Sequence, residues 1–179
     1  MAGRDVARVV NRCNQAKDDK RLDLSRCDLT RIPDAIFLLL RNIELKYCSL
    51  SQNLIKRIPS KFGTKFPTLT ELILSSNHIS SLPDELRLME GLTTLDISHN
   101  DFAALPQVVY KLDNLKIIKA EKNKIKELDV QQLKRLSSIS EVNMQDNPLT
   151  PDMYTQLTLL SDDITMLLTP QDSEFDSVD

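Results

Sequence analysis

Glycine, histidine, cysteine and aromatic residues are all scarce in this chain. Its 179 residues include three glycines, two histidines, three cysteines and no tryptophan, and aromatic residues make up 4%. Phosphate-binding loops and dinucleotide-binding turns need closely spaced glycines, because the backbone approaches an anion or takes a positive φ there. Gly3, Gly63 and Gly91 lie far apart, which excludes both motifs. We predict no catalytic residue, no metal site and no cofactor.

Long hydrophobic runs are also missing. No stretch of about 18 apolar residues occurs, so no membrane insertion is expected. The first 20 residues contain no apolar run longer than Val9-Val10, which is unlike a signal peptide. The three cysteines follow no disulfide spacing, which favours a reducing compartment. These features predict a cytoplasmic protein, with the nucleus as the alternative.

The net charge of −3 averages two unlike parts of the chain. Residues 161–179 carry six acidic residues and no basic one, which leaves 20 acidic and 23 basic residues in 1–160. The body therefore has a charge of +3. Nucleic-acid-binding proteins usually show a larger basic excess, so no nucleic-acid partner is predicted.

A pattern of apolar residues around one asparagine recurs along the chain. It reads Leu-x-x-Leu-x-Leu-x-x-Asn-x-Ile over residues 69–79. With apolar or cysteine substitutions, it recurs over 45–55, 92–102, 115–125 and 139–149, and a degenerate first unit covers 22–29. The anchor positions are spaced by 26, 24, 23, 23 and 24 residues: Cys27, Asn53, Asn77, Asn100, Asn123 and Asn147.

Each unit predicts one short strand that is stable only when stacked on its neighbours. Apolar residues two apart bury one face of a strand. Strands of this length form a continuous core only when repeated units stack in parallel. The anchor asparagine can donate and accept hydrogen bonds, and so can satisfy backbone groups that stacking would bury.

Four units also contain an apolar-proline pair after the anchor: Ile32-Pro33, Ile58-Pro59, Leu82-Pro83 and Leu105-Pro106. With the asparagine pattern, these pairs resemble the leucine-rich repeat family over about residues 22–150, and in particular its 23-residue Leu-Pro subclass of Ras-suppressor type. The resemblance implies an α/β fold, a right-handed solenoid of about six repeats, and recognition of a partner through a concave parallel sheet in intracellular signalling. Short helical turns are expected over Asp84–Met89 and Gln107–Leu112, and a more regular helix after Leu128-Asp129.

A solenoid needs caps, because a bare terminal coil exposes its core. We predict an N-terminal capping helix over 1–20, repeats over 21–150, a C-terminal cap over 151–170 and an acidic disordered tail over 171–179. The N-terminal capping face comprises Val6, Val9, Val10 and Cys13, with Arg4, Arg8 and Arg12 placed elsewhere on the helix. The C-terminal cap uses Leu157, Leu159, Leu160, Ile164, Met166, Leu167 and Leu168.

The positions between the buried leucines point to the open face of the sheet, where a partner would bind. The candidate partner-binding residues on this concave face are Tyr47, Glu71, Ile73, Thr94, Asp96, His99, Ile117, Lys119 and Lys122. Tyr47, Ile73 and Ile117 are large apolar groups, which often dominate binding energy. The alternative is that solitary surface apolar residues are ordinary.

Lysines are concentrated in the fifth repeat: Lys116, Lys119, Lys122, Lys124 and Lys126. One interpretation is a solvated face tempered by Glu121 and Glu127. The other is a docking site for an acidic segment, including the chain's own acidic tail.

We predict a monomeric, non-catalytic scaffold that binds a protein partner. One alternative is a regulatory subunit of an intracellular enzyme, in a phosphatase or small GTPase pathway. The other is an unrecognised hydrolase or metalloenzyme. His78 and His99 occupy different phases of the repeat, and no third ligand completes a metal site with them, which disfavours that alternative.

Overall fold

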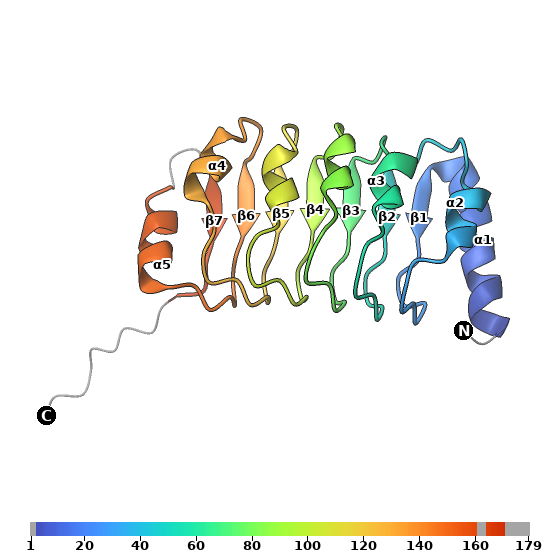
Figure 1. The fold of residues 1–179 in the computed structure, drawn as a ribbon, viewed down its shortest axis with the longest axis horizontal. Coiled ribbons are helices and arrows are strands. Elements are labelled where there is room, and N and C mark those ends of the chain that lie inside the picture. The colour runs from blue at the N-terminus through green and yellow to red at the C-terminus, as the bar shows by residue number, and fades with distance from the viewer. Residues whose placement is uncertain (1–2, 161–163, 171–179) are drawn as a thin grey trace, which may run out of the picture.

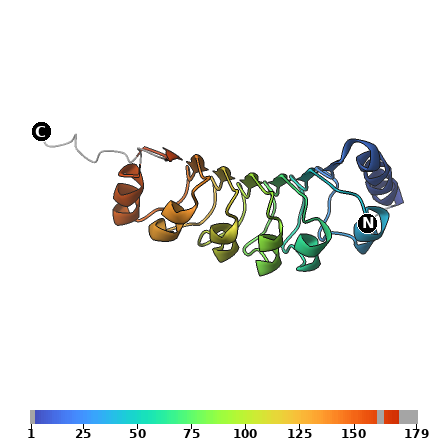
Figure 2. The same ribbon diagram turned by 90° about the horizontal axis from the view of Figure 1, so that it is seen from above.

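A computed structural model describes residues 3–160 and 164–170 of the chain. Seven strands form one parallel sheet in chain order (Figure 1). Figure 2 shows the strands along one side and the more widely splayed helices along the other, so the sheet lies on the concave side of the solenoid. The strands are β1 (Arg21–Asp23), β2 (Tyr47–Ser49), β3 (Glu71–Ile73), β4 (Thr94–Asp96), β5 (Ile117–Lys119), β6 (Glu141–Asn143) and β7 (Thr165–Leu167).

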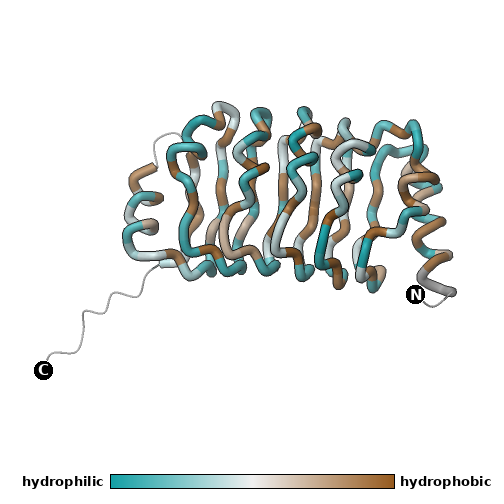
Figure 3. Tube along the Cα trace, viewed as in Figure 1, coloured by the Kyte–Doolittle hydropathy of each residue, from teal (hydrophilic) through white to brown (hydrophobic). Residues whose placement is uncertain are grey.

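Equivalent residues of successive repeats pair across the sheet, as the sequence alignment predicts. Tyr47 pairs with Glu71, Glu71 with Thr94, and Thr94 with Ile117. In β1 to β6 the central residue is fully buried. Apolar residues recur in every coil of the trace (Figure 3). One face of every strand therefore packs on the core, while the other stays open.

The sheet extends one strand beyond the predicted repeats. β7 pairs in parallel with β6 and comes from the segment predicted to be the C-terminal cap. The amide of Thr165 donates to the carbonyl of Ser140 (2.8 Å), and the amide of Met144 donates to that of Leu167 (2.8 Å). β7 thus satisfies backbone groups that the sixth repeat would otherwise leave unpaired.

The anchor asparagines connect each coil to the one before it. Asn100 Nδ2 donates to the carbonyls of Leu74 (2.9 Å) and Ile97 (3.1 Å), and its Oδ1 accepts from the amide of Ile79 (2.9 Å). The same arrangement recurs at Asn53, Asn77, Asn123 and Asn147. The predicted satisfaction of buried backbone groups by this amide is confirmed.

The turns after the strands take a conformation that the sequence analysis missed. The residue before each anchor has a φ between 52° and 56°, although none is glycine: Arg26, Gln52, Ser76, His99, Lys122 and Asp146. In the turns after β1 to β5, the amide of this residue donates to a carbonyl of the next coil, as that of Ser76 does to Ser98 (3.0 Å). Scarcity of glycine therefore did not prevent a positive φ, because these repeated hydrogen bonds hold the turn.

The outer segments are short helices, as expected from the prolines. They are α2 (Asp34–Leu39), α3 (Lys61–Lys65), the 3₁₀ helices η1 (Asp84–Leu88) and η2 (Gln107–Lys111), and α4 (Val130–Arg135). Pro33, Pro83 and Pro106 precede α2, η1 and η2. The fifth repeat lacks this proline, and Asp129 instead caps α4 by accepting from the amide of Gln132 (2.9 Å). The predicted regular helix after Leu128-Asp129 is confirmed.

Aromatic residues cluster where the first two outer segments, α2 and α3, pack. The Phe66 ring lies 5.6 Å from that of Phe37 and 5.2 Å from that of Phe62, measured between centroids. Gly63 allows η1 to approach α3, because a Cβ at this position would lie 2.1 Å from the carbonyl oxygen of Glu85.

At the N-terminus, α1 (Gly3–Asp19) covers the first coil with Val9, Cys13 and Ala16, all buried. Val6, assigned to the capping face from the sequence, is 49% exposed. The helix begins only at Gly3, and Val6 lies in its first turn, ahead of the part buried against the coil.

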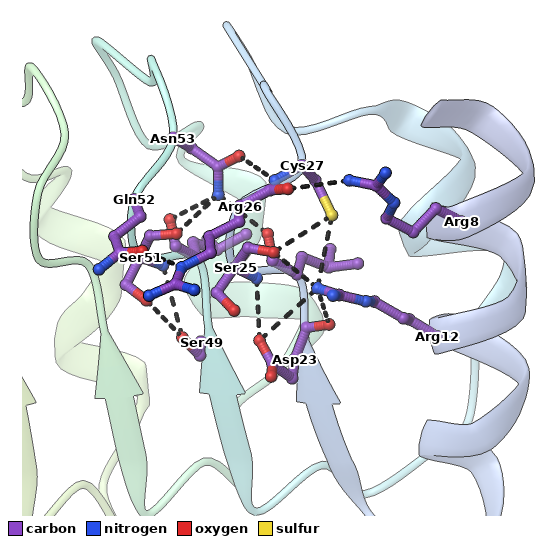
Figure 4. A network of polar contacts seen from close by, with 12 residues as sticks. Arg8, Arg12, Asp23, Ser25, Arg26, Cys27, Ser49, Ser51, Gln52 and Asn53 are labelled. Carbon is purple, nitrogen blue, oxygen red and sulfur yellow. Dashed lines mark hydrogen bonds and ion pairs between the residues drawn. The ribbon is translucent and has the colours of Figure 1, made fainter. Parts of the chain in front are cut away.

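Arg12 also belongs to the capping side, contrary to the prediction (Figure 4). Its Nη1 donates to the carbonyls of Asp23 (3.0 Å) and Ser25 (2.7 Å), and Arg8 Nη1 reaches that of Arg26 (3.0 Å). One coil later, the equivalent carbonyls of Ser49 and Ser51 accept amides from the preceding coil. The Arg12 guanidinium therefore donates to the first coil the hydrogen bonds that, in the second coil, come from backbone amides of the coil before it.

At the other end, α5 (Pro151–Thr158) follows the last turn, and Leu157, Leu160 and Ile164 are buried. Leu159, predicted to help close the last coil, is 79% exposed. It is the C-cap residue of α5, and the buried residues nearest to it in the chain are Leu157 and Leu160. The acidic tail predicted over 171–179 lies outside the described residues.

Candidate protein-binding surface

The concave surface is formed by the first and third residues of each strand together with the turns that follow. The register places seven predicted site residues on four adjacent strands: Tyr47 on β2, Glu71 and Ile73 on β3, Thr94 and Asp96 on β4, and Ile117 and Lys119 on β5. His99 and Lys122 occupy the left-handed turn positions after β4 and β5. The fold therefore places seven of the nine candidates on adjacent strands and the other two in the turns that follow those strands.

Three apolar side chains interrupt this otherwise polar surface. Tyr47, Ile73 and Ile117 are each half-buried on the open face. The Arg21 guanidinium lies 3.8 Å from the ring centroid of Tyr47, a cation–π contact that the sequence analysis missed. Arg21 precedes Tyr47 by one strand in the same column, so this pairing could have been found from the alignment.

Two carboxylates on the surface accept hydrogen bonds from the serine that lies two residues further along the chain. Asp96 Oδ1 accepts from the amide (3.0 Å) and hydroxyl (2.7 Å) of Ser98. Asp23 Oδ1 accepts from the amide of Ser25 (2.8 Å). Burial opposes ionisation of Asp23, but the hydrogen bonds from Ser25 and the nearby Arg12 lower its pKa overall. These carboxylates are fixed in position before any partner binds.

The position occupied by serine in the first four coils is Glu121 in the fifth. Its Oε2 is buried and has no hydrogen-bond partner among the described residues. A buried oxygen without a hydrogen-bond partner lowers the free energy of unfolding. Glu121 is therefore a locally unfavourable residue in the centre of the lysine-rich coil.

Three of the fifth-repeat lysines on or beside the sheet are exposed: Lys116, Lys119 and Lys122, named here the β5 lysines. None of them forms an ion pair with a described carboxylate, whereas Lys124 Nζ lies 2.6 Å from Asp101 Oδ1. The hydrogen bond from Lys124 holds the pKa of Asp101 below its usual range. The β5 lysines thus carry positive charge without an ion-pair partner among the described residues, and Lys119 does so on the open face of the strand.

The residues that could bind metal are dispersed or otherwise engaged. His78 Nδ1 lies 3.7 Å from Asp101 Oδ2, and His99 is exposed in the next turn. Within residues 3–160 and 164–170, no three His, Cys, Asp or Glu side chains cluster as a metal site. Burial raises the pKa of Cys13 to about 11 and raises that of Cys48 further, which keeps both thiols protonated and unreactive.

One shallow cavity opens at the N-terminal end of the concave surface. It has a volume of about 300 Å³ and is lined by Arg12, Gln15, Asp19, Arg21, Asp23 and Tyr47. Arg12 and Arg21 are already engaged by carbonyl groups and by the Tyr47 ring, so the cavity offers no free cation.

Stacked coils, a parallel sheet and an open face of mixed polarity define a solenoid repeat protein with a preformed surface. The match to known sequences gives the family: the model described as "Leucine-rich repeat region" covers residues 21–163. The chain belongs to the leucine-rich repeat family, which confirms the resemblance found in the sequence.

Two curated relatives carry the name Leucine-rich repeat-containing protein 20. The mouse protein is 32% identical over 175 residues, which cover 96% of this chain and 95% of the relative. The human protein is 35% identical over 94 residues, and that alignment spans about half of each chain, 50% of this one and 51% of the relative.

Solved structures agree with the fold. A leucine-rich repeat protein of Leptospira interrogans aligns with a TM-score of 0.68 and 28% identity, over 78% of this chain and 34% of that one. An internalin of Listeria monocytogenes aligns with a TM-score of 0.64 and 21% identity, over 84% and 43% respectively. Among the described residues, no helix combines the length and apolarity needed to cross a membrane.

Proposed function

We propose that the chain is a non-catalytic, monomeric scaffold that binds a protein partner on the concave surface of β2 to β5. The observation that carries the proposal is the set of half-buried apolar side chains, Tyr47, Ile73 and Ile117, on a rigid polar sheet. A partner would remove these groups from water, and large apolar or aromatic anchors tend to dominate affinity. The binding residues are Tyr47, Glu71, Ile73, Thr94, Asp96, His99, Ile117, Lys119 and Lys122.

The size of the surface limits the partner's contact. Strands about 4.8 Å apart give a width of about 14 Å from β2 to β5, which accommodates one helix or extended segment. Such an interface buries on the order of 800 Å² per partner at most. A compact contact of this kind suits a reversible scaffold in intracellular signalling.

A cytoplasmic location is part of the same proposal. Cys13, Cys27 and Cys48 are buried free thiols, and a reducing compartment keeps thiols in that state. Microscopy of the tagged protein tests the location, and retention in an oxidising compartment would contradict it.

Site-specific photo-crosslinking tests the surface. A photoreactive residue at Asp96 should give a discrete adduct with a cellular protein, while one at Gln107, on the convex side, should not. Once that partner is purified, Tyr47→Ala and Ile73→Ser should each raise Kd about tenfold or more, the effect of an anchor residue.

Leu88→Ser is the matched control, because Leu88 is an exposed apolar residue on the convex segment η1. Its Kd should stay at the parent value. Equal weakening by Leu88→Ser, or no weakening by Ile73→Ser, would place the interface elsewhere. If the partner is an enzyme, a change in its rate on binding distinguishes a regulatory subunit from a passive scaffold.

A further inference from the structure

The β5 lysines place three positive charges on one coil, with no ion-pair partner among the described residues. Lys61, Lys111 and Lys124 each contact an aspartate of a neighbouring coil. Lys116, Lys119 and Lys122 contact none among the described residues. Asp96 lies opposite Lys119 in the register, but its Oδ1 is already bound by Ser98, and it forms no ion pair with Lys119. This surface is suited to an acidic ligand.

An apolar side chain lies within the same surface. Ile117 is half-buried, opens to the concave side, and stands between Lys116 and Lys119 in the chain. A matching ligand therefore carries carboxylates close to one large apolar group. Residues 172–179 have this composition: they read Asp-Ser-Glu-Phe-Asp-Ser-Val-Asp, with four acidic residues, no basic residue and one phenylalanine.

The described part of the chain ends next to this surface. Thr169 Oγ1 accepts from the amide of Asp146 and lies 2.9 Å from its Oδ1. Asp146 occupies the turn position equivalent to Lys122, one coil further on. The two coils from β7 to β5 correspond to about 10 Å, and extended chain covers about 3.3 Å per residue. Residues 174–176 are therefore within reach of β5.

We propose that residues 172–178 dock on the concave end of β5, with their carboxylates on Lys119 and Lys122 and Phe175 against Ile117. The tether gives the segment an effective concentration on the order of millimolar, so docking needs only a roughly millimolar intrinsic Kd from the ion pairs and the Phe175 contact together. The docked segment covers part of the surface assigned above to a partner and competes with it. The inference rests on the same concave face, but its test needs no partner.

The absence of tryptophan provides a direct reporter. In the full-length Phe175→Trp protein, the sole indole should show blue-shifted emission at low salt and a red shift at 0.5 M NaCl, because screening weakens the ion pairs. Adding Lys119→Glu and Lys122→Glu should give the red-shifted emission at every salt concentration.

The matched control is Lys134→Glu with Arg135→Glu, which makes the same charge change on α4, away from the sheet. This variant should keep the blue-shifted, salt-sensitive emission. Identical emission in the parent, the β5 variant and the α4 variant would overturn the proposal. Circular dichroism confirms that each variant is folded.

Carbodiimide cross-linking identifies the contacts and their origin. The full-length protein should give links from Asp172, Glu174 or Asp176 to Lys119 or Lys122 and few to Lys134. In an equal mixture of unlabelled and ¹⁵N-labelled protein, both peptides of a link should carry the same label. Mixed-label links would assign the site to the tail of a second copy, and links spread evenly over all lysines would overturn specific docking.

The two proposals fail separately. Loss of partner binding in Tyr47→Ala and Ile73→Ser concerns β2 and β3, two or more strands from the β5 lysines. If those variants weaken the partner while the tail shows no contact with β5, the proposed function stands and this inference falls.

Discussion

At the scale of the residue, the turn position before each anchor carries a repeated strain. Six residues other than glycine hold φ near 54° there, where a side chain costs roughly 1–2 kcal/mol. The sequence showed the anchor asparagines but not this conformation, because no residue type is common to the six positions. The six positions share only their place in the sequence, directly before the anchor residue of each repeat.

Ser76→Gly should therefore stabilise the protein, by about 0.5 kcal/mol once the greater entropy of unfolded glycine is subtracted. Ser76 makes no side-chain hydrogen bond with a described residue. Ser75→Gly is the control, since Ser75 does not have a positive φ and should lose stability. Urea denaturation measures both, and equal effects would show that the turn carries no strain.

Glu121→Ser should also raise the free energy of unfolding, by about 1 kcal/mol, because it removes a buried oxygen that lacks a donor. Serine already occupies the equivalent position in four coils: Ser25, Ser51, Ser75 and Ser98. The exposed Gln145, in the next coil, provides the comparison, and Gln145→Ser should change stability little. A loss of stability in Glu121→Ser would mean that the carboxylate is satisfied in solution.

At the scale of the element, most of the architecture could be predicted from spacing. The strands, the short outer helices and the helix after Asp129 follow from apolar residues, prolines and an N-cap that recur locally. The ends of the solenoid could not be predicted so well. Arg12 was assigned away from the cap by helical periodicity, yet it binds the edge carbonyls of the first coil.

Arg12→Ala should lower the free energy of unfolding by about 1–2 kcal/mol, because hydrogen bonds from a charged donor to two carbonyls are lost. Hydrogen exchange should rise in α1 and β1 before it rises in β4. Asn11→Ala, an exposed change on the same helix, serves as the control and should leave the exchange pattern unchanged. Uniform exchange changes along the whole chain would argue against a local cap.

Gly63→Ala tests the contact between α3 and η1. The added Cβ would meet the backbone of Glu85 at 2.1 Å, and overpacking of this kind costs about 1–3 kcal/mol. Gly91→Ala is matched, because its Cβ would find only one neighbour, at 3.8 Å. Thermal melts should show a lower Tm for Gly63→Ala alone.

At the scale of the whole molecule, adjacent coils are joined by the asparagine ladder inside and by ion pairs outside. Hydrogen bonds from Lys61, Lys111 and Lys124 hold the pKa values of Asp34, Asp84 and Asp101 below the usual range. Each pair joins one coil to the next along the solenoid. The solenoid is thus stabilised by nearest-neighbour contacts that repeat along its length.

These pairs predict how stability depends on pH. A carboxylate with a lowered folded pKa contributes stability above its unfolded pKa, about 3.9, and loses it as the pH falls through the folded value. Denaturation midpoints should therefore be level above about pH 5 and fall below pH 4. The triple variant Asp34→Asn, Asp84→Asn and Asp101→Asn should have a lower plateau and a flatter acid limb. Parallel acid limbs for the two proteins would show that the pairs contribute nothing.

The sequence by itself determined the family, the strand register, the buried core and which residues share the concave surface. It could do so because each of these follows from a short apolar pattern that repeats along the chain, and the apolar residues of one repeat pack on the equivalent residues of the next. Tertiary structure decided what occurs once: the guanidinium cap on the first coil and the seventh strand, which comes from the segment predicted to be the C-terminal cap. Arg12 belongs to no repeat and shares no period with the carbonyls that it binds, so only the folded chain brings them together.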